Sequence, residues 1–269
     1  MALRWLTAII GIPLVLTAVW IGGAVWLLLL SLIACLGLYE WSARLPLTPA
    51  ERLFLLLASL MPLSLVFGNY LLHSLFLWVL LLLLYLVLRS RQSQRAELER
   101  LASLFPWLLF GVVYIPLFMA VGGVLRQSES GLLWVLFSLL VTWSNDTGAF
   151  FMGLWLRGPK IAPSISPNKT WSGSLGGILG ACILAAIVSY YRPFDWMLPL
   201  PLTVGTALCL AIAGQIGDLF ESFWKRSSGI KDSGTMIPGH GGVLDRFDSL
   251  LIVWPVLYLI TTGVSQGHP

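Results

Sequence analysis

Long blocks of apolar residues with almost no charge limit what this sequence can fold into. The run LFLWVLLLLLYLVL at residues 75–88, for example, is apolar on every face of a helix. Blocks of about 20 such residues cross a hydrocarbon layer of roughly 30 Å as helices. Only 10% of the 269 residues are charged, against about 25% in an ordinary soluble domain. The alternating strands of about ten residues that a membrane barrel needs are absent. The sequence therefore predicts an all-α, polytopic integral membrane protein.

About nine transmembrane helices are expected, separated by short polar stretches. The predicted spans are residues 6–21, 24–43, 50–67, 70–88, 103–125, 131–156, 173–191, 198–223 and 247–264. Five of them fall in residues 1–130, the N-terminal membrane helices. The other four fall in residues 131–269.

The positive charges sort strongly to one side of this topology. Fourteen of the sixteen Lys and Arg residues fall at the N-terminus or in the even-numbered connections, and only Arg126 and Arg192 fall on the opposite side. Because positively charged residues are retained on the cytoplasmic face, this asymmetry predicts a cytoplasmic N-terminus. The most polar stretch, RSRQSQRAELER at residues 89–100, is interpreted as a solvated or helical connection at the lipid headgroups.

Two long connections on the predicted cytoplasmic side differ from the others. Residues 157–172 and 224–246 are rich in Gly, Pro, Ser and Thr and together carry seven of the sixteen basic residues. Backbone N–H groups in such loops, together with Lys and Arg, make pockets for phosphate groups. Charge alone would favour ordinary positive-inside loops.

Acidic residues beside these loops favour a functional interpretation. Asp146 and Asp218 lie within predicted spans, where an ionisable group is costly and marks a functional site by default. Asp218, Glu221, Ser222 and Lys225 follow a helical spacing, so one helix face leads from a membrane carboxylate to the basic loop.

Asp245 and Asp248 are three residues apart where the last span begins. Two structural alternatives stay open for the acids. Asp245 or Asp248 could complement a helix dipole, and Asp146 or Asp218 could pair with a base and lock two helices together.

The acids together suggest magnesium. Hard oxygen ligands without a His or Cys cluster suit Mg²⁺, which often binds through one or two carboxylates and substrate phosphates. Carboxylates, magnesium and lysines describe phosphoryl or nucleotidyl transfer. No Walker A sequence is present, and the glycines of SGSLGGILG from Ser172 are expected to pack helices, either within one subunit or between two, which leaves a homodimer open. His240, between Gly239 and Gly241, could approach a phosphate.

The stretch SFWKRSSGIKDSGTMIPGHGGVLDRFD, from Ser222 to Asp248, resembles the signature of phosphatidate cytidylyltransferases, also called CDP-diacylglycerol synthases. The matching positions are Ser222, Lys225, Arg226, Lys231, Asp232, His240, Gly241, Gly242, Asp245, Arg246 and Asp248. SNDTGAFFMG from Ser144 and SISPNKTWSG from Ser164 resemble the family's Asp-containing span and its Ser-Pro-x-Lys-Thr loop, here with Ser166 and Lys169. The N-terminal half resembles the family only in its span pattern and in Glu40 beside Trp41.

Two positions depart from the family pattern. Trp224 stands where an aliphatic residue or Phe is usual, and Ser172 stands where Glu is common. Any role of that Glu must be absent here or be supplied by another acid.

The resemblance implies that CTP and phosphatidic acid react to give CDP-diacylglycerol and pyrophosphate, with Mg²⁺ as cofactor, in phospholipid biosynthesis. On this hypothesis Asp218 and Asp245 hold the metal, and Asp146 and Asp248 are further ligands or orienting acids. The expected substrate-binding residues are Ser166, Lys169, Lys225, Arg226, Lys231, His240, Gly241, Gly242 and Arg246, and the expected catalytic residues are Asp146, Lys169, Asp218, Asp245 and Asp248. The expected location is the inner (cytoplasmic) membrane, with the active site facing the cytoplasm, the lipid bilayer as its surroundings and no nucleic acid partner.

Two other functions compete with this one. In an ion-coupled transporter, Asp146 and Asp218 would carry ions or protons, but such a protein needs acids near mid-bilayer that are reachable from both faces. Here the acids gather toward one face, beside the basic loops. Another CTP-dependent lipid transferase or kinase is the nearer alternative.

Overall fold

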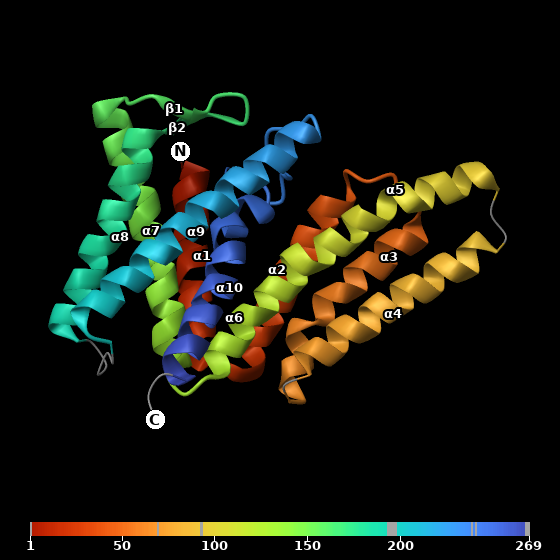
Figure 1. Ribbon diagram of the computed structural model, residues 1–269, viewed down its shortest axis with the longest axis horizontal. Helices are drawn as coiled ribbons and strands as arrows, with labels where there is room; N and C mark the ends of the chain where they lie inside the picture. Colours follow the sequence, from red (N-terminus) through yellow and green to blue (C-terminus); the bar gives the residue numbers. More distant parts are fainter. Residues whose placement is uncertain are drawn as a thin grey trace. The chain divides into compact units, whose positions relative to one another are not determined.

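The computed structural model describes residues 2–68, 70–91, 94–192, 198–237, 239 and 241–266. Over these residues every predicted span is helical, which confirms the all-α architecture (Figure 1). The elements in chain order are α1 (Ala2–Ile21), α2 (Gly23–Ser42), α3 (Pro49–Leu57), η1 (Ala58–Leu60), η2 (Pro62–Val66), α4 (Leu71–Ser90), α5 (Arg95–Val112), η3 (Val113–Leu117), α6 (Phe118–Gln127), α7 (Gly131–Leu156), β1 (Lys160–Ala162), β2 (Ser166–Thr170), α8 (Trp171–Tyr191), α9 (Leu200–Ser227) and α10 (Leu244–Gln266).

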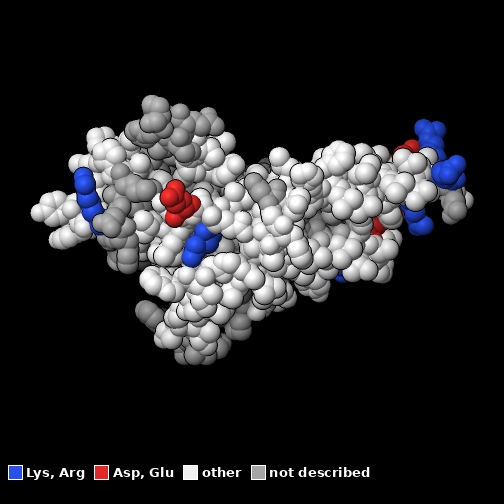
Figure 2. All heavy atoms as spheres, turned by 90° about the horizontal axis from the view of Figure 1, so that it is seen from below, with Lys and Arg blue, Asp and Glu red and all other residues white. Residues whose placement is uncertain are grey.

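Within the described part of the chain, six helical segments are long and apolar enough to cross a membrane. They are Gly23–Ser42, Pro49–Val66, Leu71–Ser90, Arg95–Gln127, Trp171–Tyr191 and Leu200–Ser227. One face of the molecule shows charged side chains only sparsely among uncharged atoms (Figure 2). These features are those of a helical membrane protein.

Two of the helical segments change their winding at a proline. The segment that starts at Pro49 passes from α3 into the 3₁₀ turns η1 and η2, and Pro62 is the first residue of η2. The segment that starts at Arg95 contains the π-helical stretch η3, with Pro116 inside it. Proline lacks an N–H donor and its ring clashes with the preceding turn, so the regular α-helical hydrogen bonds cannot continue there.

The chain divides into two compact units, which are described separately. Unit 1 comprises Met1–Gln127 and Met236–Leu244, and unit 2 comprises Ser128–Thr235 and Asp245–Pro269. In unit 1 the buried Trp26 of α2 donates its indole N–H to the carbonyl of Gly122, 3.1 Å away. Arg126 donates to the carbonyls of Val19 and Trp20 at the end of α1, at 2.6 and 3.1 Å. Arg126, one of the two basic residues on the predicted outer side, thus caps a helix C-terminus.

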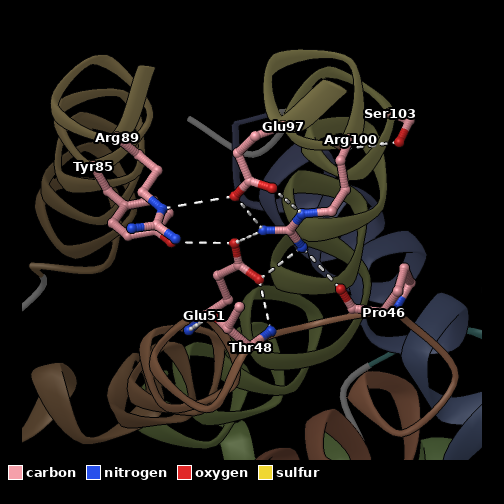
Figure 3. Close-up of polar contacts among 8 residues, drawn as sticks. All are labelled: Pro46, Thr48, Glu51, Tyr85, Arg89, Glu97, Arg100 and Ser103. Atoms are coloured by element: carbon pink, nitrogen blue, oxygen red, sulfur yellow. Dashed lines mark hydrogen bonds and ion pairs between the residues drawn. The ribbon is translucent and has the colours of Figure 1, made fainter. Parts of the chain in front are cut away.

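An ion-pair network around the buried Glu51 joins α3, α4 and α5 in unit 1 (Figure 3). The Glu51 carboxylate accepts hydrogen bonds from the Arg100 guanidinium at 2.6 and 3.2 Å and from the Tyr85 hydroxyl at 3.1 Å. Glu51 also forms a capping box with Thr48 at the start of α3. Arg100 binds Glu97 as well, at 2.9 Å. The C-terminal part of the polar stretch 89–100 therefore forms the first turns of α5, and these turns bind α3 and α4 through the network around Glu51.

Arg100→Met should lower the thermal stability of the protein. The Glu51 side chain is only 1% exposed, and removal of Arg100 leaves this buried carboxylate without a cation, with only Tyr85 and the Thr48 N–H still donating to it. We expect a loss of about 3 kcal/mol, measured as a lower melting temperature in detergent. Arg95→Met is the matched control, because the Arg95 to Glu99 pair is exposed, at 93% and 70%. Equal melting temperatures for the two variants would contradict the role of this network.

In unit 2, glycines bring α7 and α8 into close contact (Figure 1). A Cβ atom added to Gly148 would collide with the backbone of Gly176. A Cβ atom added to Gly177 would lie 2.6 Å from Asn145 Oδ1 and 3.1 Å from Gln215 Nε2. This confirms the expected role of the SGSLGGILG glycines in helix packing, within a single chain.

Gly177→Ala should destabilise unit 2. The added methyl group would push Asn145 and Gln215 apart, and overpacking of this kind costs about 1–3 kcal/mol. Gly205→Ala is the control: Gly205 lies in α9, and a Cβ atom there would meet nothing within 4 Å, so helix propensity should make this change neutral or stabilising. Thermal unfolding of both variants tests the difference, and a Gly177→Ala protein as stable as wild type would refute the close contact.

Candidate active site

A cavity of about 710 Å³ lies in unit 2 between α7, α8, α9 and the β hairpin. Its polar lining comprises Asn145, Asp146, Arg157, Lys160, Asn168, Lys169, Thr170, Ser174, Gln215, Asp218 and Ser249. Apolar side chains, among them Phe150, Leu154 and Ile161, complete the wall. The cavity thus combines two carboxylates, three basic side chains and an apolar flank in a membrane protein.

The hairpin carries Lys169 to the cavity. Within the predicted loop 157–172, β1 and β2 pair in antiparallel fashion, with Lys160 opposite Thr170 and Ala162 opposite Ser166. The Lys169 ammonium group lies 2.5 Å from the Asp218 carboxylate of α9. The Asp218 side chain is 38% exposed, whereas the Lys169 side chain is 24% exposed and its ammonium nitrogen is buried against that carboxylate. The hairpin was missed in the sequence, because strands of three and five residues carry too little periodicity to be recognised.

A network of amides fixes the polar part of the cavity. Gln215 donates to Asn145 Oδ1 at 2.8 Å and to the Ser174 carbonyl at 3.0 Å. The Ser174 hydroxyl donates to Gln215 Oε1, and the Asn145 amide lies 3.4 Å from Asp146 Oδ1. Sequence reasoning missed Asn145, Ser174 and Gln215. For Asn145 and Gln215 the available signal was a polar residue inside an apolar span, one turn or less from Asp146 or Asp218. Ser174 carried no such signal.

A second polar cluster in unit 2 surrounds Asp245, which is not among the cavity-lining residues. Lys225 donates to Asp245 Oδ1 at 2.6 Å, and the backbone and hydroxyl of Ser233 donate to Oδ2 at 3.0 and 3.1 Å. Glu221 lies 3.5 Å from the Lys225 ammonium group. Glu221 is only 1% exposed, and its carboxylate lies close to that of Asp248. Glu221 is a further acid of this region that the predicted site set did not contain.

Several acids of unit 2 lie close enough to one another for their negative charges to repel. Asp218 interacts electrostatically with Asp146 and with Asp248, and Glu221 interacts with Asp248 and Asp245. Over the described ranges, no three His, Cys, Asp or Glu side chains converge closely enough to hold a metal ion by themselves. Mg²⁺ commonly takes only one or two carboxylates, with waters and substrate phosphates as its other ligands. Asp146 and Asp218, which line one cavity, fit that requirement.

The remaining predicted residues of unit 2 lie outside the cavity lining. Ser166 is the first residue of β2. Arg226 donates to the carbonyls of Ile165 and Ile230, at 3.2 and 2.9 Å, and so ties the hairpin turn to the loop after α9. Lys231 and Arg246 are exposed.

The glycines of the predicted His-Gly-Gly motif belong to the other unit. Gly241 and Gly242 lie in the segment Met236–Leu244 of unit 1, directly before α10. The Gly241 carbonyl accepts a hydrogen bond from the Ile237 N–H at 3.0 Å. His240 lies outside the described residues.

The two departures from the family pattern have structural roles. The Ser172 hydroxyl accepts the Gly158 N–H at 3.0 Å and lies 3.2 Å from the Thr170 hydroxyl. Thr170 in turn caps α8 by accepting the Gly173 N–H at 3.0 Å. Ser172 thus closes the base of the hairpin. Trp224 of α9 is buried, at 3% exposed.

The sequence matches one family model over almost its whole length. The model of the Cytidylyltransferase family covers residues 2–263. The chain belongs to this family. The cavity, its acids and the basic hairpin are therefore features of a cytidylyltransferase, a family whose name implies transfer of a cytidylyl group.

Curated relatives carry a more specific name. A phosphatidate cytidylyltransferase of Staphylococcus haemolyticus is 34% identical over 267 residues, which is 97% of this chain and 98% of the relative. One of Brucella suis is 44% identical over 158 residues, 57% of this chain and 56% of the relative. One of Staphylococcus aureus is 42% identical over 135 residues, 49% of this chain and 50% of the relative. The match spans only about half the length of the Brucella and S. aureus relatives.

Proposed function

We propose that this cytidylyltransferase transfers the CMP moiety of CTP to phosphatidic acid, giving CDP-diacylglycerol and pyrophosphate in phospholipid biosynthesis. The observation that carries this proposal is the cavity itself. It presents two carboxylates, Asp146 and Asp218, beside Arg157, Lys160 and Lys169, and has apolar residues on its flank. A site for two polyanions, one of them a lipid, needs this combination. The names of the relatives support the choice of substrates.

The reaction joins two polyanions and requires little proton chemistry. A phosphate oxygen of phosphatidic acid would attack the α-phosphorus of CTP and form a new P–O bond. The bond from that phosphorus to the oxygen bridging the β-phosphate would break, and pyrophosphate would leave with its electron pair. The main obstacle is the mutual repulsion of the reactants, so positioned cations supply most of the catalysis.

The basic residues would divide this work by position. Lys169 lines the cavity and pairs with Asp218. When substrate binds, the Lys169 ammonium group would leave that carboxylate and contact a substrate phosphate instead. Lys225, held by Asp245, would contact phosphate from the α9 side. Arg226, Lys231, Arg246, Ser166, His240 and the backbone of Gly241 and Gly242 complete the proposed substrate-binding set.

Magnesium is the proposed cofactor. Asp146 and Asp218 would hold it, in place of the expected pair Asp218 and Asp245, because Asp245 already binds Lys225 and Ser233. Asp245 and Asp248 would be the further acids of the site. The ion would neutralise phosphate charge as the α-phosphorus is attacked. The amide network of Asn145 and Gln215 would keep the carboxylate of Asp146 in place when CTP binds.

The proposed topology has nine spans, with the N-terminus in the cytoplasm. The sorting of Lys and Arg supports it. The hairpin and the α9–α10 loop would then face the cytoplasm, where CTP is available, and phosphatidic acid would come from the inner membrane. This places the reaction at the headgroup plane.

Product analysis tests the function. Membranes containing the protein are incubated with CTP labelled in the α-phosphate and either phosphatidic acid or a polyprenol. We expect the label in CDP-diacylglycerol, release of unlabelled pyrophosphate and no product from the polyprenol. A lipid kinase would instead transfer the γ-phosphate, and a transporter would consume no CTP. Either of those results would refute the proposal.

Asp218→Asn should lower kcat about 100-fold, because charge stabilisation at the phosphates is lost. Glu129→Gln, a change of an exposed acid in the same unit, is the control and should retain wild-type turnover. Both variants are compared at equal folded concentration, judged by gel filtration in detergent. Wild-type turnover in Asp218→Asn would remove this residue from the site.

Removal of divalent ions should abolish turnover, and Mg²⁺ should restore it. The measurement is CTP incorporation after treatment with EDTA, followed by titration with MgCl₂. In Asp146→Asn the Mg²⁺ concentration for half-maximal activity should rise, because one ligand is weakened. Full activity in EDTA would contradict the magnesium assignment.

A further inference from the structure

The first turn of α10 carries Asp245, yet the sequence just before it contains no side chain that can cap a helix. The first N–H groups of a helix have no partner inside the helix, and Ser, Thr, Asp or Asn usually supplies one. Here the preceding residues are Gly241, Gly242 and Val243. Val243 and Leu244 are also buried, at 5% and 2% exposed, so water cannot readily satisfy their N–H groups.

A carboxylate from a distant helix takes this role. Glu40 of α2 accepts the Val243 N–H on one oxygen at 2.9 Å and the Leu244 N–H on the other at 3.0 Å. Glu40 is 3% exposed and lies more than 200 residues away in sequence. A carboxylate at a helix N-terminus gains both from charge-assisted hydrogen bonds and from the helix dipole.

Packing around Glu40 supports the same contact. Gly37 lies one turn earlier on α2, and a Cβ atom placed there would lie 3.6 Å from the Leu244 side chain. The segment Met236–Leu244 belongs to the same unit as α2. Helix α2 therefore contacts the start of α10 in two ways: Glu40 binds the backbone N–H groups of Val243 and Leu244, and Gly37 lies beside the Leu244 side chain.

We propose that Glu40 is a positioning residue, whose carboxylate caps α10 and thereby holds the helical turn that carries Asp245. Leu244 and Asp245 are consecutive residues of α10, so a shift of the capped backbone is passed directly to Asp245. Asp245 in turn fixes Lys225 and Ser233. Loss of the cap should misplace this cluster and weaken its contact with the triphosphate.

Glu40→Gln is the central variant. Glutamine has the same size, but its amide has only one acceptor oxygen and no charge. The N–H groups of Val243 and Leu244 can then no longer each have an acceptor oxygen of their own. We expect the KM for CTP to rise about tenfold, as misplacement of substrate-positioning groups does. We also expect faster amide exchange in the peptide 241–248, measured by hydrogen–deuterium exchange on the full chain.

Glu51→Gln is the matched control. Glu51 is equally buried, at 2%, lies in the same unit and also accepts several hydrogen bonds, but it caps α3 rather than α10. The Glu51→Gln variant should have a lower melting temperature than wild type, with an unchanged KM for CTP and unchanged amide exchange in peptide 241–248. A general effect of losing a buried carboxylate would appear in both variants.

Each result decides the proposal. A merely structural role would reduce the active fraction and leave KM unchanged, so a lower maximal rate with unchanged KM in Glu40→Gln overturns it. If Glu40→Gln does not fold, Glu40→Asp keeps the charge with a shorter reach and should show a smaller rise of both readouts. Wild-type values of both readouts in Glu40→Asp would then overturn the proposal.

The kinetic readout rests on the proposed function, whereas the exchange readout does not. Faster exchange in Glu40→Gln, with no CTP turnover in the wild-type protein, would therefore refute the proposed function and still support the cap.

Discussion

The high cost of placing a charge among apolar helices governs this structure. Buried acids here have a partner of opposite charge or a set of backbone donors. Glu51 binds Arg100, Asp245 binds Lys225, and Glu40 binds two backbone N–H groups of another segment. Since a lone charge in this environment would be too costly to keep, each pair also specifies which helices meet. The acids therefore connect helices of the fold and are also candidates for a role in the reaction.

The same pairing would suit the anionic substrates proposed for the cavity. In the structure Lys169 and Asp218 satisfy each other, while the cavity beside them keeps Arg157 and Lys160 in its lining. A phosphate group entering there would meet cations that are already held in place. The close approach of α7 and α8 at Gly148 and Gly177 brings Asn145 within reach of Gln215 and so stiffens the wall that carries Asp146.

Much of the helical fold could be predicted because blocks of apolar residues are local features of a sequence. The helical segments follow from block length, and the packing role of the α8 glycines follows from their small size. Asp146 and Asp218 could be predicted as site candidates because ionisable residues are rare in such blocks, and Lys169 because it lies in a basic loop beside them. The β hairpin was missed because it is too short to show a period, and Gln215 and Ser174 were missed because a lone polar residue in a helix has many structural explanations.

The sequence by itself determined that the chain is a helical membrane protein with acids beside basic loops, since hydropathy and charge are properties of single residues and their order. Only the tertiary structure decided which acid meets which base. Asp218 pairs with Lys169, Asp245 pairs with Lys225, and Glu40 binds the start of α10. These pairings join residues up to about 200 positions apart in sequence. No local pattern encodes such contacts, because they arise from the way whole helices pack.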